Sequence, residues 1–120
     1  MPGKVLVVDD SPTMRRIVAN TLKRIGYSDL AEAENGEEAL ELLGENTFEL
    51  IVTDWNMPGR SGLEFIRSVR SDDRNDLPIL MVTTRSEAED VKEALQAGAS
   101  SYIVKPFTPE VLKEKIDSIV

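Results

Sequence analysis

Five polar residues that can act together in metal or phosphate chemistry stand where short apolar runs of the sequence end. They are Asp9 and Asp10 after the run at residues 4–8, Asp54 after 50–53, Thr83 after 79–82 and Lys105 after 102–104. Short apolar runs bounded by turn residues are typical of strands buried on both faces, as in a parallel sheet. Open α/β folds bind ligands at the carboxyl edge of that sheet. We therefore expect these side chains to meet at one edge.

Three carboxylates at one edge need positive charge beside them. Two unit charges about 5 Å apart repel by roughly 3 kcal/mol at an effective dielectric of about 20. Lys105 supplies one cation, and the remaining charge indicates a divalent ion with oxygen ligands. An open site with few carboxylates suits Mg²⁺ better than Ca²⁺.

A lysine, a hydroxyl and Mg²⁺ around one carboxylate favour phosphoryl transfer, in which positioned positive charge stabilises the phosphoryl oxygens. Asp54 is the predicted nucleophile, because carboxylates accept phosphoryl groups covalently. Asp9, Asp10 and the backbone carbonyl of Asn56 complete the predicted metal site with Asp54. Thr83 and Lys105 would each contact a phosphoryl oxygen. The sequence has no glycine-rich nucleotide loop, so ATP is not expected as the direct donor, and it has no histidine.

Helical patterns separate the apolar runs. Predicted helix starts are Ser11-Pro12, Asn35 with Glu38, the capping boxes Ser61–Glu64 and Ser86–Glu89, and Thr108-Pro109, and predicted stops are Gly26 and Gly98. The inward positions expected on the first helix include Ile17, Val18 and Leu22, and those on the fourth are Ala88, Val91 and Leu95. A polar loop is expected at 71–76.

This alternation of five strands, the second at 30–33, with five helices predicts an α/β, doubly wound fold: a parallel sheet with helices on both faces. We expect one domain over residues 1–120, with no output domain.

The net charge of −8 disfavours nucleic acid and anionic membranes as partners. The sequence has no cysteine, no apolar stretch of the ~20 residues needed to span a membrane, and no signal-peptide pattern. A cytoplasmic location is expected.

The motifs, taken in order, carry a resemblance to a known family. VDD at 8–10, Asp54 with NMPG at 56–59, TT at 83–84 and KPF at 105–107 resemble the response-regulator receiver family along the whole chain, and most of all its stand-alone chemotaxis regulators. This resemblance implies the flavodoxin-like strand order 2-1-3-4-5. It further implies Mg²⁺-dependent phosphorylation of Asp54 from a phosphohistidine on a sensor histidine kinase. Such a protein is a signalling switch that catalyses only its own phosphorylation and dephosphorylation.

The resemblance also implies how the signal leaves the site. Thr83 and Tyr102 are the expected switch residues, with the Tyr102 ring moving from an exposed to a buried position. The expected partner face lies on helix four, strand five and helix five and includes Val91, Tyr102, Val104 and Lys115. Expected partners of the monomer are a chemotaxis kinase, a flagellar motor switch protein or another target, and a phosphatase. Another stand-alone role, as a phosphorelay intermediate, remains open.

Several neighbouring residues carry further expectations. Arg85 and Asn56 lie at positions that the family varies, where they bear on the lifetime of the phosphoryl group. The family precedent at Lys105-Pro106 is a cis peptide. Trp55 is expected to be exposed and without a chemical role.

Two other functions are disfavoured by particular residues. An aspartyl-phosphate phosphohydrolase needs a general acid two residues after its nucleophile, and Asn56 cannot donate and recover a proton. An FMN-binding protein of the same fold needs a hydroxyl- and glycine-rich phosphate loop after the first strand. The segment at 11–13 is too short for this, and Asp9 and Asp10 would repel phosphate.

Overall fold

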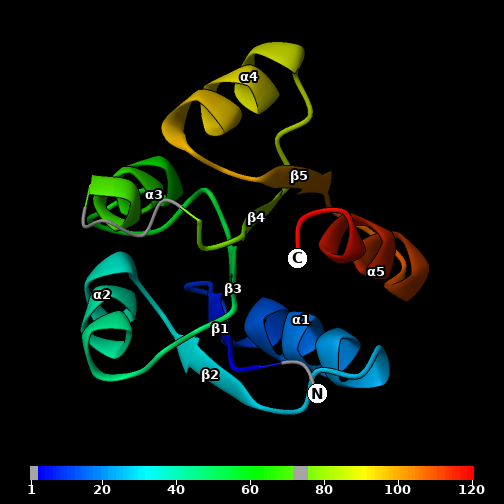
Figure 1. Ribbon diagram of the computed structural model, residues 1–120. Coiled ribbons are helices and arrows are strands. Elements are labelled where there is room, and N and C mark those ends of the chain that lie inside the picture. Colours follow the sequence, from blue (N-terminus) through cyan, green and yellow to red (C-terminus); the bar gives the residue numbers. More distant parts are fainter. Residues whose placement is uncertain (1–2, 72–75) are drawn as a thin grey trace.

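A five-stranded parallel sheet with helices on both faces forms the centre of the computed structural model, which describes residues 3–71 and 76–120 (Figure 1). In chain order the elements are β1 (Val5–Val8), α1 (Pro12–Arg24), β2 (Leu30–Ala33), α2 (Gly36–Glu45), β3 (Leu50–Thr53), α3 (Gly62–Ser71), β4 (Ile79–Thr83), α4 (Ala88–Ala97), β5 (Ser101–Val104) and α5 (Pro109–Asp117). The strand order β2-β1-β3-β4-β5 confirms the predicted fold. Most of the predicted polar loop, residues 72–75, lies outside the described residues.

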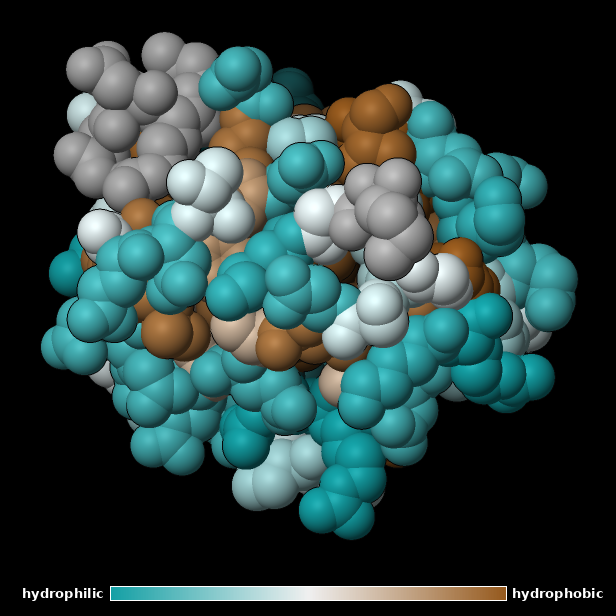
Figure 2. All heavy atoms as spheres, turned by 60° about the horizontal axis from the view of Figure 1, so that its bottom comes forward, coloured by the Kyte–Doolittle hydropathy of each residue, from teal (hydrophilic) through white to brown (hydrophobic). Residues whose placement is uncertain are grey.

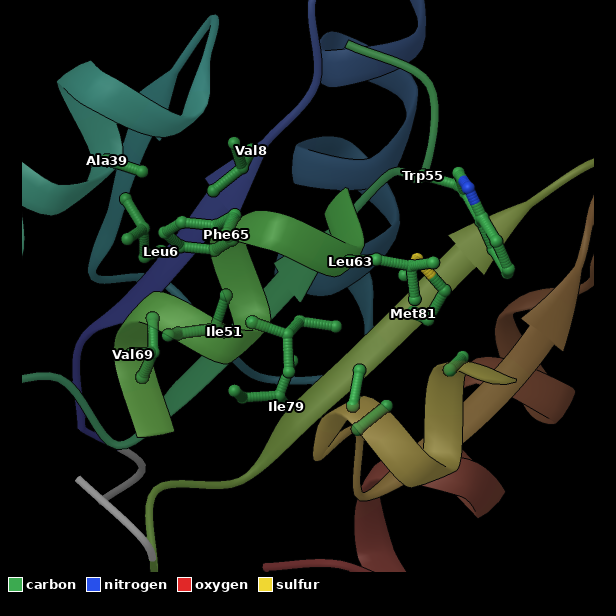
Figure 3. Close-up of a cluster of buried hydrophobic side chains, with 14 of the residues drawn as sticks. Leu6, Val8, Ala39, Ile51, Trp55, Leu63, Phe65, Val69, Ile79 and Met81 are labelled. Carbon is green, nitrogen blue, oxygen red and sulfur yellow. The ribbon is translucent and has the colours of Figure 1, made fainter. Parts of the chain in front are cut away.

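The sheet divides the core into two layers. In β1, β3 and β4 every residue is buried, and successive side chains enter opposite layers. One layer packs against α2, α3 and α4, where Phe65 contacts the sheet beside Leu6 and Ile51 (Figure 3). The other layer packs against α1 and α5 and contains Val7, Val52 and Leu112. Continuous apolar runs are therefore required in the central strands.

The strand register brings the predicted site residues to one edge. Val8 pairs with Ala33 on one side and with Thr53 on the other. The ladder continues one step further, because Asp9 N–H donates to the Ala33 carbonyl (3.1 Å) and Asp54 N–H donates to the Val8 carbonyl (3.0 Å). At the same carboxyl edge, between β4 and β5, Lys105 N–H donates to the Thr83 carbonyl (2.8 Å).

Four of the five helices begin at a predicted cap. Ser11, Asn35 and Thr108 each accept a backbone N–H with the side chain, and Ser61 and Glu64 form the predicted reciprocal box. The predicted Ser86–Glu89 box is wrong. Helix α4 begins one residue later, after Glu87, which makes no side-chain cap hydrogen bond. Ser86 then precedes the N-cap position, from which a hydroxyl does not cap the first turn.

The predicted inward faces of α1 and α4 are wrong in part. Ile17 is 46% exposed and Leu95 is 47% exposed, and Ala88 is exposed as well. The buried residues are Val18, Ala19 and Leu22 in α1, and Ala94 and Ala97 in α4, with Val91 half-buried. Both helices carry apolar residues on more than one flank, so packing against the sheet decides which flank is covered. Among the described residues, no helix has the length and apolarity needed to cross a membrane.

Candidate functional site

Three aspartates converge at the carboxyl edge of the sheet. Carboxylate oxygens from Asp9, Asp10 and Asp54 all lie within 4.8 Å of one another. Asp9 is buried, Asp54 is half-buried and Asp10 is exposed, so the cluster opens to solvent on one side. This geometry confirms that the ends of the two neighbouring strands β1 and β3 bring the carboxylates together.

Lys105 reaches this cluster from the end of β5. Its Nζ lies 3.4 Å from Asp9 Oδ2 and 3.7 Å from Asp54 Oδ1, and only 11% of its side chain is exposed. The peptide bond that follows, Lys105-Pro106, is cis. One ammonium among three carboxylates leaves an excess of negative charge. An oxygen-only, partly open donor set of this kind fits a hard divalent cation such as Mg²⁺.

The environment of Asp54 disfavours its charged form. Burial raises the pKa of the Asp54 carboxyl above its ordinary value. The Lys105 ammonium and the Trp55 N–H, which donates to Asp54 Oδ1 at 2.7 Å, lower the same pKa, whereas Asp9 and Asp10 raise it. The upward effects prevail, so a cation bound beside Asp54 would relieve an existing electrostatic cost.

Gly62, at the start of α3, makes the close packing behind Asp54 possible. Its N–H donates to the Trp55 carbonyl at 2.7 Å. A Cβ atom at this position would lie 2.2 Å from the Asp54 carbonyl oxygen. Only glycine therefore fits, because any larger residue would displace the backbone that carries Asp54. In the sequence, Gly62 is recognisable only as an inner position of the capping box Ser61–Glu64.

Thr83 ends β4, the strand that lies between the strands of Asp54 and Lys105. The residue is fully buried, and its Oγ1 accepts a hydrogen bond from the Arg85 N–H at 3.3 Å. Thr84, the next residue, is exposed. The position of Thr83 suits the predicted role, since its hydroxyl oxygen belongs to the edge at which the other site residues end.

Arg85 connects several parts of the site. Its Nη2 donates to Asn56 Oδ1 at 3.1 Å, and its Nη1 lies 3.6 Å from Asp90 Oδ1 in the first turn of α4. Its guanidinium carbon lies 4.5 Å from the centre of the Trp55 ring. The two residues predicted to bear on phosphoryl lifetime, Arg85 and Asn56, are thus in direct contact.

Trp55 is buried, so the prediction of an exposed ring is wrong. The residue is 5% exposed, and it lies near Leu63 and Met81 at one end of the core layer (Figure 3). Its ring meets Tyr102 edge to face, with centroids 6.4 Å apart and the planes at 79°. Arg85, from the loop after β4, and Tyr102, from β5, therefore help to cover the ring, and both lie far from Trp55 in the sequence.

Tyr102 is buried as well, at 8% exposure. Its hydroxyl donates to the Arg85 carbonyl oxygen at 2.8 Å. The expected exposed starting position of the ring is therefore not the one that the structure has. On the predicted partner face, Val104 is exposed and Val91 and Lys115 are half-buried, so these three residues are the accessible members.

Comparisons with known proteins agree with this geometry. Residues 5–117 match the response regulator receiver domain family. The sequence is 54% identical over 119 residues to chemotaxis protein CheY1 of Helicobacter pylori, covering 98% of this chain and 96% of that one. It is 50% identical to chemotaxis protein CheY of Pseudomonas aeruginosa, with 97% and 94% covered. The structure resembles chemotaxis protein CheY4 of Vibrio cholerae with a TM-score of 0.92, at 38% identity and full coverage of both chains.

Proposed function

The chain belongs to the response regulator receiver domain family, and on this premise we propose that it is a response regulator switched by phosphorylation of Asp54. It is a CheY-like receiver, a signalling protein and not an enzyme of the usual kind. The observation that carries the proposal is the convergence of Asp9, Asp10 and Asp54 with Lys105 at the carboxyl edge of the sheet.

The proposed reaction transfers a phosphoryl group from a phosphohistidine. An Asp54 Oδ atom attacks phosphorus, the bond from phosphorus to the histidine nitrogen breaks, and the imidazole keeps the electron pair. Lys105 and the Thr83 hydroxyl stabilise the charge on the phosphoryl oxygens. Asp9, Asp10, Asp54 and the Asn56 carbonyl would hold Mg²⁺, which supplies positive charge to the same oxygens. Because this chain contains no histidine, the donor belongs to another protein.

The relatives indicate which proteins the chain would meet. Those with about half of their residues identical to this chain are chemotaxis proteins. We therefore assign the donor to a chemotaxis sensor kinase and the target to a flagellar motor switch protein. The accessible residues Val91, Val104 and Lys115 belong to the proposed target face.

The proposed switch passes through the loop between β4 and α4. The Thr83 hydroxyl accepts the Arg85 N–H, and the Arg85 carbonyl accepts the Tyr102 hydroxyl. A Thr83 side chain drawn toward a phosphoryl group would give up its bond to Arg85, and this loop would then rearrange. The free chain would already visit that arrangement, and phosphorylation would increase its population.

Labelling with a small phosphodonor tests the proposal. Incubation with Mg²⁺ and acetyl phosphate should add one phosphoryl group, seen by intact-protein mass spectrometry, and a chelator of Mg²⁺ should prevent the addition. Asp54→Asn should abolish the addition, with circular dichroism as the control for folding. Stoichiometric labelling of Asp54→Asn would overturn the assignment.

A further inference from the structure

Arg15, in the second turn of α1, holds the loop that carries two of the three aspartates. Its Nη1 donates to the Asp9 carbonyl oxygen at 2.8 Å. Its Nε donates to Glu32 Oε1 on the edge strand β2 at 3.0 Å. The Arg15 side chain is 18% exposed, whereas its partner Glu32 is 49% exposed. One guanidinium thus joins the helix, the loop and the sheet.

Asp9 is held at each of its polar atoms. Its N–H donates to the Ala33 carbonyl at 3.1 Å, and its carbonyl accepts from Arg15. Its Oδ1 accepts the Ser11 N–H at 2.9 Å, and its Oδ2 accepts from Lys105 Nζ at 3.4 Å. Arg15 therefore supplies one of four constraints on this residue, and the only one of them that acts on the carbonyl.

Asp10 has no comparable support of its own. Within residues 3–71 and 76–120, no hydrogen bond or ion pair is found for its exposed carboxylate. The direction of that side chain depends on the peptide group between Asp9 and Asp10. The oxygen of that peptide group is the carbonyl oxygen that Arg15 binds. The Arg15 contact therefore fixes the peptide plane from which the Asp10 side chain projects.

We propose that Arg15 is a positioning residue for the divalent-cation site, because it keeps the Asp10 carboxylate within reach of Asp9 and Asp54. The inference rests on the proposed function, which places Mg²⁺ among these three carboxylates. Arg15 would not bind the ion or the phosphoryl group. Residues that orient metal ligands in this indirect way typically change metal affinity about 10–100-fold when they are replaced.

The sign of the effect distinguishes positioning from simple charge. Arg15 carries a positive charge near the site, and that charge alone repels a cation. If only the charge mattered, Arg15→Gln would bind Mg²⁺ more tightly. If Arg15 orients the loop, Arg15→Gln binds Mg²⁺ more weakly, and so does Arg15→Lys, which keeps the charge but lacks the planar fork of the guanidinium.

Calorimetric titration of the full chain with Mg²⁺ tests the inference. We expect Arg15→Gln and Arg15→Lys to lower the Mg²⁺ affinity about tenfold or more, and Glu32→Gln to lower it by less. Arg16→Gln is the matched control, because Arg16 is exposed on the same helix and its replacement removes the same charge. Urea unfolding in the presence of a chelator checks that each variant is folded at the titration temperature.

Each outcome of this titration decides one question. An unchanged or higher affinity in Arg15→Gln overturns the inference, as does an equal loss in Arg16→Gln. Wild-type protein that fails to bind Mg²⁺ defeats the proposed metal site itself, and the inference with it. Wild-type protein that binds Mg²⁺ and is labelled at Asp54, beside Arg15 variants of unchanged affinity, leaves the proposed function intact and removes only the role of Arg15.

Discussion

Helices α1 and α4 both follow a strand that carries site residues, yet the two are attached to the molecule very differently. Helix α1 begins with Pro12 after a Ser11 cap and buries Val18, Ala19 and Leu22. Helix α4 begins without a side-chain cap, and its buried residues are Ala94 and Ala97. The helix beside the metal-site loop is thus fixed by large side chains and a cap. The helix beside Thr83 packs against the core only through two alanine methyl groups and the half-buried Val91.

The two ends of α4 also differ. At its C-terminal end, the half-buried Arg70 donates to the Gly98 carbonyl through Nε (3.0 Å) and Nη2 (2.8 Å), and to the Leu77 carbonyl through Nη1 (2.7 Å). At its N-terminal end, Asp90 meets Arg85, whose side chain is 42% exposed. Exposed ion pairs stabilise a fold by only about 0–1 kcal/mol. Asp9 and Asp10 thus lie beside a firmly packed helix, whereas α4 is firmly held at one end only.

Replacing one leucine by alanine in each helix should give the largest difference in stability between α1 and α4. Leu22 in α1 is fully buried, whereas Leu95 in α4 is 47% exposed. Leu22→Ala should lower the free energy of unfolding by about 2–5 kcal/mol, because it leaves a cavity. Leu95→Ala should change it by less than about 0.5 kcal/mol. Urea unfolding measures both, and similar losses would show that α4 is as firmly packed as α1.

Replacing the two arginines at the ends of α4 should give the second largest difference in the free energy of unfolding. Arg70→Gln should lower the free energy of unfolding by about 1.5–3 kcal/mol, because it removes hydrogen bonds from a charged donor to part-buried carbonyls. Arg85→Gln should cost less than about 1 kcal/mol. Arg85→Gln should nevertheless change the fluorescence of Trp55, the single tryptophan, since the guanidinium lies over its ring.

The Arg85→Gln variant also bears on signalling. Freed from Arg85, the N-terminal end of α4 should shift toward the active arrangement, so the unphosphorylated chain should bind a target peptide more tightly. Unchanged peptide affinity in Arg85→Gln would argue against α4 as the moving element. A larger loss of stability in Arg85→Gln than in Arg70→Gln would reverse the assignment of the firm and loose ends.

Two serines at the starts of these helices give a smaller effect. Ser11 caps α1 and accepts the Met14 N–H at 3.2 Å, whereas Ser86 precedes the N-cap of α4. Ser11→Ala should lower the free energy of unfolding by about 1 kcal/mol, and Ser86→Ala should leave it nearly unchanged. Glu87→Ser should add the missing cap and reduce the phosphorylation-dependent gain in peptide affinity. A loss in Ser86→Ala equal to that in Ser11→Ala would restore the capping box that the structure lacks.

The smallest effect concerns Tyr102, which attaches β5 to the loop before α4. Burial raises the pKa of its phenol above the ordinary value, Asp90 adds to the rise and Arg85 opposes it. The folded chain therefore holds this proton more tightly than the unfolded chain does. The resulting stabilisation is fully present below the ordinary pKa of about 10 and is lost as the pH rises through the higher folded value.

Tyrosinate absorbance measures this titration. Burial also raises the pKa of Tyr27, the other tyrosine, so the two must be separated. Tyr27→Phe leaves Tyr102 as the only phenol, and this phenol should ionise at a higher pH than free tyrosine does. A phenol that titrates at the ordinary pKa in that variant would show that the ring does not stay buried.

The sequence was sufficient to predict the sheet because buried parallel strands leave a strong signal. Continuous apolar runs located β1, β3, β4 and β5, and a weaker pattern with alternating acids located β2, all to within about one residue, the usual uncertainty of such boundaries. Strand ends then placed Asp9, Asp54, Thr83 and Lys105 at one edge, since parallel strands share a direction. The buried faces of α1 and α4 were not predictable in the same way, because Ile17 and Leu95 fit the helical spacing of apolar residues without facing the sheet.

The contacts that support the site were not predicted, for a different reason. The sequence singled out Arg85 by its position, but the contacts of Arg85 and Arg15 are made by long side chains and depend on how the helices and loops pack. Gly62 matters because of one backbone oxygen that lies 2.2 Å from the position of an absent Cβ. Trp55 is covered by residues about 30 and 47 positions away, and local patterns carry no information on such contacts.

The contact between Lys105 and Asp9 has a consequence for the making of the protein. The two residues are 96 positions apart in the chain, near its two ends. During synthesis, β1, β2 and β3 emerge before β5, so an aspartate cluster formed from these strands alone would lack its lysine and keep its full mutual repulsion. The binding edge gains the ammonium of Lys105 only after β5 has joined the sheet, which relieves part of this repulsion.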